Sequence, residues 1–169
     1  MTSDLDILKT IKHSFLSVVE NDSVLLKITA NERSVTHRLA VYLERQFEGT
    51  GFQVDCEYNR DRRKPKRLKE FKRKISSDNT KGVTVYPDII VHKRDTDENL
   101  IVIEAKFERS SLDCNQLDSC ICDRCKLRAY KNDLGYSYAF FIRFPTGNSL
   151  VNLDADCLDA FIEPIADEE

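Results

Sequence analysis

Two carboxylates and a lysine stand where they could bind a metal ion and activate a water molecule. Asp88 precedes one apolar run of the chain, Glu104 lies inside the next, and Lys106 follows two residues later. Two opposed carboxylates repel each other unless a cation offsets the repulsion, and Mg²⁺ (or Mn²⁺) prefers such oxygen ligands. A bound metal polarises a phosphoryl oxygen and lowers the pKa of bound water, while an ammonium group stabilises developing negative charge. The spacing therefore predicts Asp88 and Glu104 as metal ligands and Lys106 as the group that assists hydrolysis.

These side chains meet if the two apolar runs form an antiparallel hairpin. Residues 83 to 92, interrupted by a proline, and residues 100 to 107 have the composition of strands, and the polar residues 93 to 99 are typical of a turn. Residues two apart on a strand share a face, so Lys106 is expected on the same side as Glu104. A turn centred on Thr96 predicts these pairs: His92 with Leu100, Ile90 with Val102, and Asp88 with Glu104.

A plainer interpretation makes Glu104 and Lys106 an ordinary exposed pair and Asp88 a turn residue after Pro87. The apolar density of residues 101 to 105 argues against it, because such a run is typical of a central strand. Charged side chains in a central strand need a compensating partner. We therefore favour the interpretation in which the three residues share a function.

The flanking sequence predicts the elements that enclose the hairpin. Apolar residues recur at helical spacing before Asn21, and again between a Thr29-x-x-Glu32 capping pattern and Gly49. The order helix, helix, strand, hairpin, helix, strand predicts an α/β sandwich with a central mixed sheet flanked by helices. The expected further elements are a helix over 3–20, a strand over 52–58, an irregular stretch over 108–120, a helix over about 121–134 ending at Gly135, and a strand over 136–144.

The motif in this setting resembles that of a known enzyme superfamily. Pro87-Asp88, fifteen residues, and then Glu104-Ala105-Lys106 is similar to the motif of the PD-(D/E)xK nucleases, which include restriction endonucleases. Their core is a helix, a three-strand meander, a helix and a further strand, which matches residues 31 to 144. The resemblance implies that Asp88, Glu104 and the carbonyl of Ala105 hold Mg²⁺, and that Lys106 positions or activates the attacking water.

The same resemblance implies a function and a domain organisation. The chain is expected to be a metal-dependent endonuclease that hydrolyses phosphodiester bonds, in DNA by preference. The alternative is a catalytically inactive module of the same fold that binds nucleic acid or a protein partner. One domain over 1–169 is expected, with a helical N-terminal extension over 1–28, a restriction-endonuclease-like core over 29–145 and an acidic C-terminal tail over 146–169.

Glu32 has two interpretations. Many members of that superfamily add a glutamate from the first core helix, and Glu32 is the matching position, which predicts a catalytic role as an outer metal ligand. It also lies three and seven residues before Val35 and Leu39 of the apolar stripe. The alternative is that it closes a capping box with Thr29. The sequence leaves both open.

A basic segment and one further lysine are candidates for binding nucleic acid. Residues 60 to 74 hold ten basic and two acidic side chains, a local charge of +8 in a chain whose net charge is −3. Such a strip is either a solvated loop or a phosphate-binding surface. Lys126 lies on the helix that follows the motif, and in similar nucleases this helix faces the substrate. Tyr130 of the same helix fits its apolar packing stripe instead. The candidate contacts in the strip are Arg60, Arg62, Arg63, Lys64, Lys66 and Arg67.

Four of the six cysteines fall close together. Four thiolates can form a tetrahedral Zn²⁺ site, and the Cys-x-x-Cys spacing of Cys122 and Cys125 is common among zinc ligands. A structural zinc ion would help to order the stretch before the third helix. The alternative is a set of free thiols. The four residues are Cys114, Cys120, Cys122 and Cys125.

The composition excludes some classes of protein. No stretch approaches the roughly 20 apolar residues of a membrane span, and charged residues interrupt the N-terminal apolar pattern where a signal peptide needs an unbroken run. We therefore expect a cytoplasmic protein with reduced cysteines and no membrane partner. The oligomeric state stays open, a homodimer or a larger assembly included.

Overall fold

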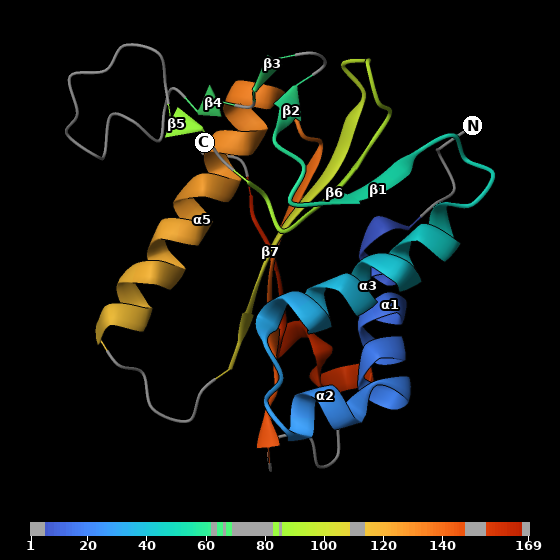
Figure 1. The fold of residues 1–169 in the computed structure, drawn as a ribbon, viewed down its shortest axis with the longest axis vertical. Helices are drawn as coiled ribbons and strands as arrows, with labels where there is room; N and C mark the ends of the chain where they lie inside the picture. Colours follow the sequence, from blue (N-terminus) through green and yellow to red (C-terminus); the bar gives the residue numbers. More distant parts are fainter. Residues whose placement is uncertain are drawn as a thin grey trace.

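A five-stranded mixed sheet forms the centre of the protein, with helices on both of its faces (Figure 1). The computed structural model describes residues 6–61, 64–65, 67–68, 83–84, 86–108, 114–147 and 155–166. The strand order is β1-β6-β7-β8-β9; β7 and β8 run parallel, and the other neighbours are antiparallel. The strands span Gln53–Cys56 (β1), Ile89–His92 (β6), Asn99–Phe107 (β7), Tyr138–Phe144 (β8) and Ile162–Pro164 (β9). The predicted α/β arrangement around a mixed sheet is thus confirmed.

Three helices cover one face of the sheet: α1 (Ile7–Asn21), α2 (Ser23–Lys27) and α3 (Glu32–Phe47). The apolar residues of α1 and α3 join those of β6, β7 and β8 in the larger core cluster. Phe15 of α1 stacks on Phe144 of β8 with ring centroids 5.1 Å apart. The N-terminal helix is therefore part of the main core, although the sequence predicted it as an extension of that core.

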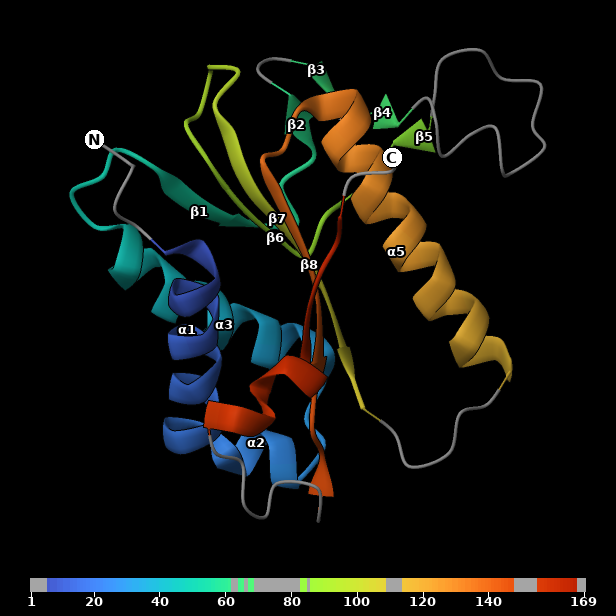
Figure 2. The ribbon, with the colours of Figure 1, turned by 180° about the vertical axis from the view of Figure 1, so that it is seen from behind.

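Helix α5 (Cys114–Leu134) covers the opposite face (Figures 1 and 2). Its residues Leu127 and Tyr130 pack against Ile90, Val102 and Phe141 in a second core cluster. The helix ends before Gly135, whose φ of +68° suits glycine, as predicted. The prediction of an irregular stretch up to residue 120 is wrong from residue 114 onward. Residues 114 to 120 show no helical spacing of apolar residues. The packed part of α5 nucleates the helix, and each residue added at its N-terminal end then gains a backbone hydrogen bond, so the helix extends back to residue 114.

The register of the β6–β7 hairpin is as predicted at its inner end. Ile89 pairs with Ile103 and Ile90 with Val102. The register shifts between Val91 and His92, so His92 pairs with Asn99 and the predicted pair with Leu100 is wrong. The irregularity lies at the turn end of the hairpin, so it leaves the paired residues nearest to Asp88 in place.

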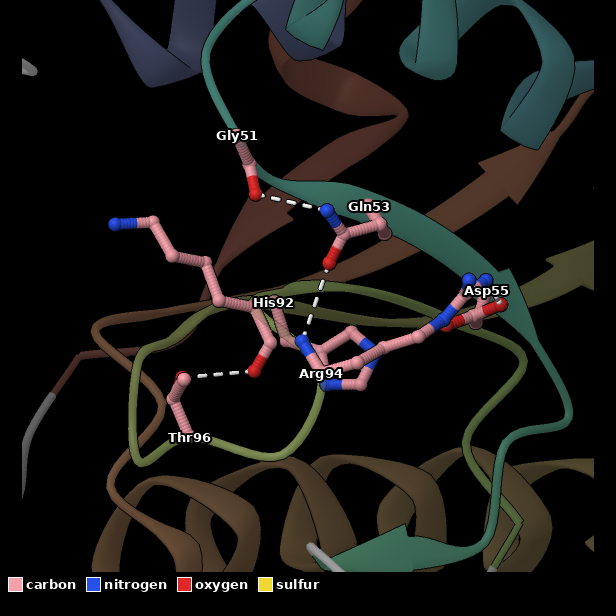
Figure 3. Close-up of polar contacts among 7 residues, drawn as sticks. Gly51, Gln53, Asp55, His92, Arg94 and Thr96 are labelled. Carbon is pink, nitrogen blue, oxygen red and sulfur yellow. Dashed lines mark hydrogen bonds and ion pairs between the residues drawn. The ribbon is translucent and has the colours of Figure 1, made fainter.

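A polar network joins the edge strand β1 to the turn end of this hairpin (Figure 3). His92 Nε2 lies 2.9 Å from Asp55 Oδ2, and Arg94 Nε donates to the same oxygen at 2.9 Å. Burial alone would raise the pKa of Asp55, but the hydrogen bonds from Arg94 and His92 lower it below its ordinary value. The backbone amide of Arg94 also donates to Gln53 Oε1. His92, to which the sequence assigned no chemistry, thus helps to hold β1 against β6.

The C-terminal region contributes to the sheet. A 3-10 helix η2 (Ala155–Ala160) precedes β9, which pairs with β8 as the edge strand. Leu158 and Ile162 are buried in the larger core cluster. The prediction of an acidic tail is therefore wrong for residues 155 to 166. The acidic residues dominate the composition of this region, but its apolar residues are the ones that pack into the core.

Short strands start within the basic segment and lie beside the C-terminal half of α5 in both views (Figures 1 and 2). β2 pairs with β3 and β4 pairs with β5. Leu68 of β4 is fully buried in the cluster beneath α5. The described strand β4 of the segment therefore lies on the α5 side of the sheet. The four strands are Arg60–Asp61 (β2), Lys64–Pro65 (β3), Arg67–Leu68 (β4) and Val83–Thr84 (β5).

No helix in the described part of the chain combines the length and the apolar composition that a membrane crossing needs.

Candidate metal-binding site

Asp88 and Glu104 are brought together by the hairpin, on the face of the sheet that α5 covers. Asp88 directly precedes β6, and its Oδ2 accepts a hydrogen bond of 2.8 Å from the backbone amide of Ala105 in β7. Burial raises the pKa of Asp88, although the Ala105 amide and the charge of Lys106 act in the opposite direction. The hydrogen bond fixes one carboxylate oxygen and leaves the other available to a ligand.

Glu104 is the most deeply buried acid of the site. Its side chain is 3% exposed, and Oε1 has no hydrogen-bond partner among the described residues. Burial, and to a smaller degree the charge of Asp88, raises the pKa of Glu104 well above its ordinary value. A buried carboxylate without a partner destabilises the fold unless a cation or a proton compensates it. The Glu104 carboxylate therefore favours binding a cation or a proton.

Lys106 lies between two acids. Its Nζ is 3.8 Å from Glu32 Oε2 and 3.7 Å from Asp123 Oδ2. Burial alone would lower the pKa of Lys106, but the surrounding carboxylates, with Asp123 and Glu32 foremost, raise it above its ordinary value. The ammonium form of Lys106 is therefore favoured.

Glu32 reaches the motif strand and takes no part in a capping box. Asn31 is the N-cap of α3, and its Oδ1 accepts a hydrogen bond of 2.9 Å from the backbone amide of Ser34. Thr29 has a φ of +49° and lies outside the helix, so the predicted capping box is wrong. Glu32 Oε1 instead accepts a hydrogen bond of 3.1 Å from the backbone amide of Phe107. Asn31 takes the N-cap because it directly precedes the first residue of α3, so its side-chain oxygen reaches the free backbone amide of Ser34.

Asp123 on α5 completes the cluster, and the sequence analysis missed it. It is 3% exposed, its Oδ1 lies 2.7 Å from Lys126 Nζ, and its Oδ2 faces Lys106. Burial alone would lower the pKa of Lys126, but the charge of Glu104 and the hydrogen bond to Asp123 raise it. Tyr130, one helical turn after Lys126, is fully buried in the core, as its packing interpretation predicted. The spacing of Asp123, Lys126 and Tyr130, at i, i+3 and i+7, is the signal that could have identified the acid.

The charges of this cluster fit a divalent cation. Four carboxylates (Glu32, Asp88, Glu104 and Asp123) surround two ammonium groups (Lys106 and Lys126). The excess is two negative charges when all six side chains are ionised, and one Mg²⁺ or Mn²⁺ ion would neutralise it. Within the described residues, no three His, Cys, Asp or Glu side chains form a metal-binding group by themselves. Magnesium sites commonly use one or two carboxylates and take their remaining ligands from water or substrate phosphate, so the Asp88–Glu104 pair is a sufficient protein contribution.

A cleft of about 340 Å³ opens beside Asp88 and Ala105. Glu32, Arg33 and His37 from the first turns of α3 line it, as does Glu57 after β1. This size suits a small-molecule ligand or one unit of a polymer. His37, to which the sequence assigned no role, therefore lines the same cleft as Asp88.

The cysteines do not support the predicted zinc site. Cys114, Cys120, Cys122 and Cys125 all lie on the single helix α5. Cys114 and Cys125 are about 16 Å apart along its axis at 1.5 Å per residue. Two sulfur atoms bound to one zinc ion lie within about 5 Å of each other. One helix therefore cannot bring all four to one ion, and neither Cys122 nor Cys125 forms a disulfide with another described cysteine.

Part of the predicted nucleic-acid surface lies outside the described residues. Arg60, Lys64 and Arg67 are placed through their backbone in β2, β3 and β4. Arg62, Arg63 and Lys66 belong to the undescribed positions. Lys126, the remaining candidate, is half-buried and lies within the charged cluster.

Comparison with known proteins adds no further assignment: no family model matches the chain, and neither a curated protein nor a solved structure is significantly similar to it.

Proposed function

We propose that this protein is a metal-dependent nuclease with a restriction-endonuclease-like fold, which hydrolyses phosphodiester bonds in DNA. One observation carries the proposal. The carboxylate of Glu104 is buried with an unpartnered oxygen, next to Asp88 and two residues before Lys106. A purely structural site would have replaced such a carboxylate with an apolar side chain or supplied it with a hydrogen-bond donor.

Asp88, Glu104 and the carbonyl of Ala105 would hold Mg²⁺ or Mn²⁺. When bound, the ion supplies positive charge at the phosphoryl oxygen and lowers the pKa of its water ligand. The hydrogen bond from the Ala105 amide orients Asp88 for this task. Glu32 contributes through Lys106 and the backbone of Phe107, which makes it an outer residue of the site.

Lys106 and Lys126 supply positive charge from the protein. Lys106 lies on the strand that carries Glu104, and Lys126 comes from the facing helix. Ammonium groups fixed in a partly buried site stabilise the negative charge that develops on a phosphoryl group more strongly than they would in water. The basic segment 60 to 74, whose described strand β4 packs against α5, would hold the nucleic-acid backbone through charge alone.

The test is cleavage of supercoiled plasmid DNA with Mg²⁺ or Mn²⁺, comparing wild type with Lys106→Ala. We expect nicked and linear products from wild type, none in EDTA, and a loss of at least 100-fold in Lys106→Ala, as for other groups that stabilise a transition state. Lys93→Ala is the matched control, because Lys93 is a lysine of the same hairpin that pairs with Glu98 at the turn end. Wild type that binds DNA with either metal but leaves it intact would favour an inactive binding module. Cleavage of RNA alone in a parallel assay would contradict the proposed substrate.

A further inference from the structure

Asp123 is a buried acid that forms ion pairs with two lysines from different elements. Its Oδ1 accepts from Lys126 Nζ at 2.7 Å within α5, and its Oδ2 lies 3.7 Å from Lys106 Nζ in β7. The side chain is almost fully buried, and Oδ2 has no hydrogen-bond partner among the residues described. One carboxylate thus lies between two ammonium groups that would otherwise repel each other.

Packing of the helix does not require this acid. The apolar residues of α5 that face the sheet, Leu127 and Tyr130 among them, already form a core cluster with β7 and β8. A two-pronged ion pair between Arg124 of α5 and Glu163 of β9, with contacts of 2.6 to 3.1 Å, adds a polar attachment. Burying a further carboxylate generally stabilises a protein no more than an apolar residue of similar size would. The position of Asp123 therefore calls for a reason other than stability.

The reason lies in what the two lysines must do. A lysine side chain is a flexible four-carbon stem with a compact charge, so its ammonium group occupies many positions unless something restrains it. Catalytic groups lose effect when misplaced by about 1 Å, by as much as 100-fold. The Nζ atoms of Lys106 and Lys126 lie 3.7 Å and 2.7 Å from the same Asp123 carboxylate, so both ammonium groups belong to one site.

We propose that Asp123 is a positioning residue that holds Lys106 and Lys126 together as a two-ammonium clamp for the phosphodiester group. This inference rests on the proposed nuclease function and adds to it. Asp88 and Glu104 provide the face that takes the metal ion. Asp123 holds the two ammonium groups in place, and each would donate a remaining N–H to a non-bridging oxygen of the phosphodiester. Such donors, fixed before the substrate arrives, need no reorganisation during the reaction.

The first experiment compares Asp123→Asn with Glu163→Gln, since each neutralises a carboxylate that forms an ion pair with α5. We expect Asp123→Asn to lower kcat for plasmid cleavage by about 10- to 100-fold, with KM within threefold of wild type. Glu163→Gln should lower the melting temperature without changing kcat. A kcat for Asp123→Asn equal to that of wild type would overturn the inference, and so would equal losses in the two variants.

The second experiment is a double-mutant cycle with Lys126→Met. If Asp123 acts by placing Lys126, the loss caused by Asp123→Asn must shrink when Lys126 is already absent. Independent, multiplicative losses would show that Asp123 acts in another way and would overturn the inference. A merely structural role of Asp123 would not produce the coupling.

A third measurement separates this inference from the proposed function. Crystal structures of wild type and Asp123→Asn report the positions of both Nζ atoms without any need for turnover. Displaced or disordered ammonium groups in the variant support positioning by Asp123, and unchanged positions overturn it. Wild type that fails to cleave any nucleic acid with Mg²⁺ or Mn²⁺ would instead refute the nuclease function, whatever the two structures show.

Discussion

Glu32 Oε1 accepts a hydrogen bond from the backbone amide of Phe107, across a separation of 3.1 Å in space and 75 residues in the chain. The contact joins the first residue of α3 to the last residue of β7. Because the second oxygen of Glu32 lies 3.8 Å from Lys106, the same side chain touches both the backbone and the lysine of the candidate site. Glu32 thereby couples the helices on one face of the sheet to the charged cluster on the other.

Substitution of Glu32 should separate these two contacts. Glu32→Gln keeps an oxygen that can accept from the Phe107 amide but removes the charge beside Lys106, so we expect cleavage to fall about tenfold with little change in stability. Glu32→Ala loses the hydrogen bond as well and should lower the free energy of unfolding by about 1 kcal/mol. Urea unfolding and plasmid cleavage measure the two effects, with Glu44→Gln on the exposed side of α3 as control. Full activity in Glu32→Gln would exclude an electrostatic role.

The metal-free protein should become less stable as the pH rises, and Glu104 should be a main cause. Burial raises the pKa of Glu104 in the folded state, so the folded state binds that proton more tightly than the unfolded state does. Stability is then highest below the unfolded pKa of about 4.3 and falls as the pH rises towards the folded pKa. Each unit between the two pKa values corresponds to about 1.4 kcal/mol.

Glu104→Gln should therefore stabilise the metal-free protein at pH 8 and flatten the pH dependence, while abolishing cleavage. Asp88, whose pKa is also raised, should account for part of the slope that remains. Urea unfolding in EDTA at several pH values measures this, and Glu98→Gln, an exposed acid of the same hairpin, is the control. A variant less stable than wild type at pH 8 would show that the Glu104 carboxylate has a stabilising partner in the absence of metal.

Divalent cations should stabilise the fold, and more so at high pH. Mg²⁺ or Mn²⁺ must displace the proton that the raised pKa keeps on Glu104, so metal affinity should increase as the pH rises. A cation at 100 times its dissociation constant adds about 2.7 kcal/mol to stability. Thermal melting with and without the metal at pH 5.5 and 8 measures this effect. Asp88→Asn and Glu104→Gln should abolish it, whereas Asp95→Asn at the hairpin turn should not.

Nucleic-acid binding should depend strongly on salt through the basic segment. If half of the ten basic residues in 60 to 74 contact phosphate, log affinity for duplex DNA should fall against log salt with a slope of roughly −4 to −5. Replacing Arg62, Arg63, Lys64, Lys66 and Arg67 with alanine should flatten the slope, measured in Ca²⁺ to prevent cleavage. An unchanged slope would show that other residues bind the phosphates.

The local pattern of the sequence determined the hairpin and the face on which its acids lie. Side chains alternate with a period of two along a strand, so the apolar residues 101 and 103 place Glu104 and Lys106 on the opposite face by geometry alone. The pairing of Ile90 with Val102 followed from the same argument, and it brings Asp88 to Glu104. Near the turn the argument failed at His92, because an irregularity in the ladder depends on the turn conformation.

Only the tertiary structure decided which distant residues complete the site. Asp123 and Lys126 are an unremarkable pair in the sequence, and α5 must pack on the sheet before Asp123 becomes buried against Lys106. The sequence pattern of Glu32 also fitted a capping box. In the structure Asn31 is the N-cap of α3, and Glu32 instead accepts a hydrogen bond from the Phe107 amide. Short-range patterns report which face a side chain takes within its own element. The partner it meets depends on the packing of whole elements, whose long-range contacts the spacing of residues along the chain does not encode.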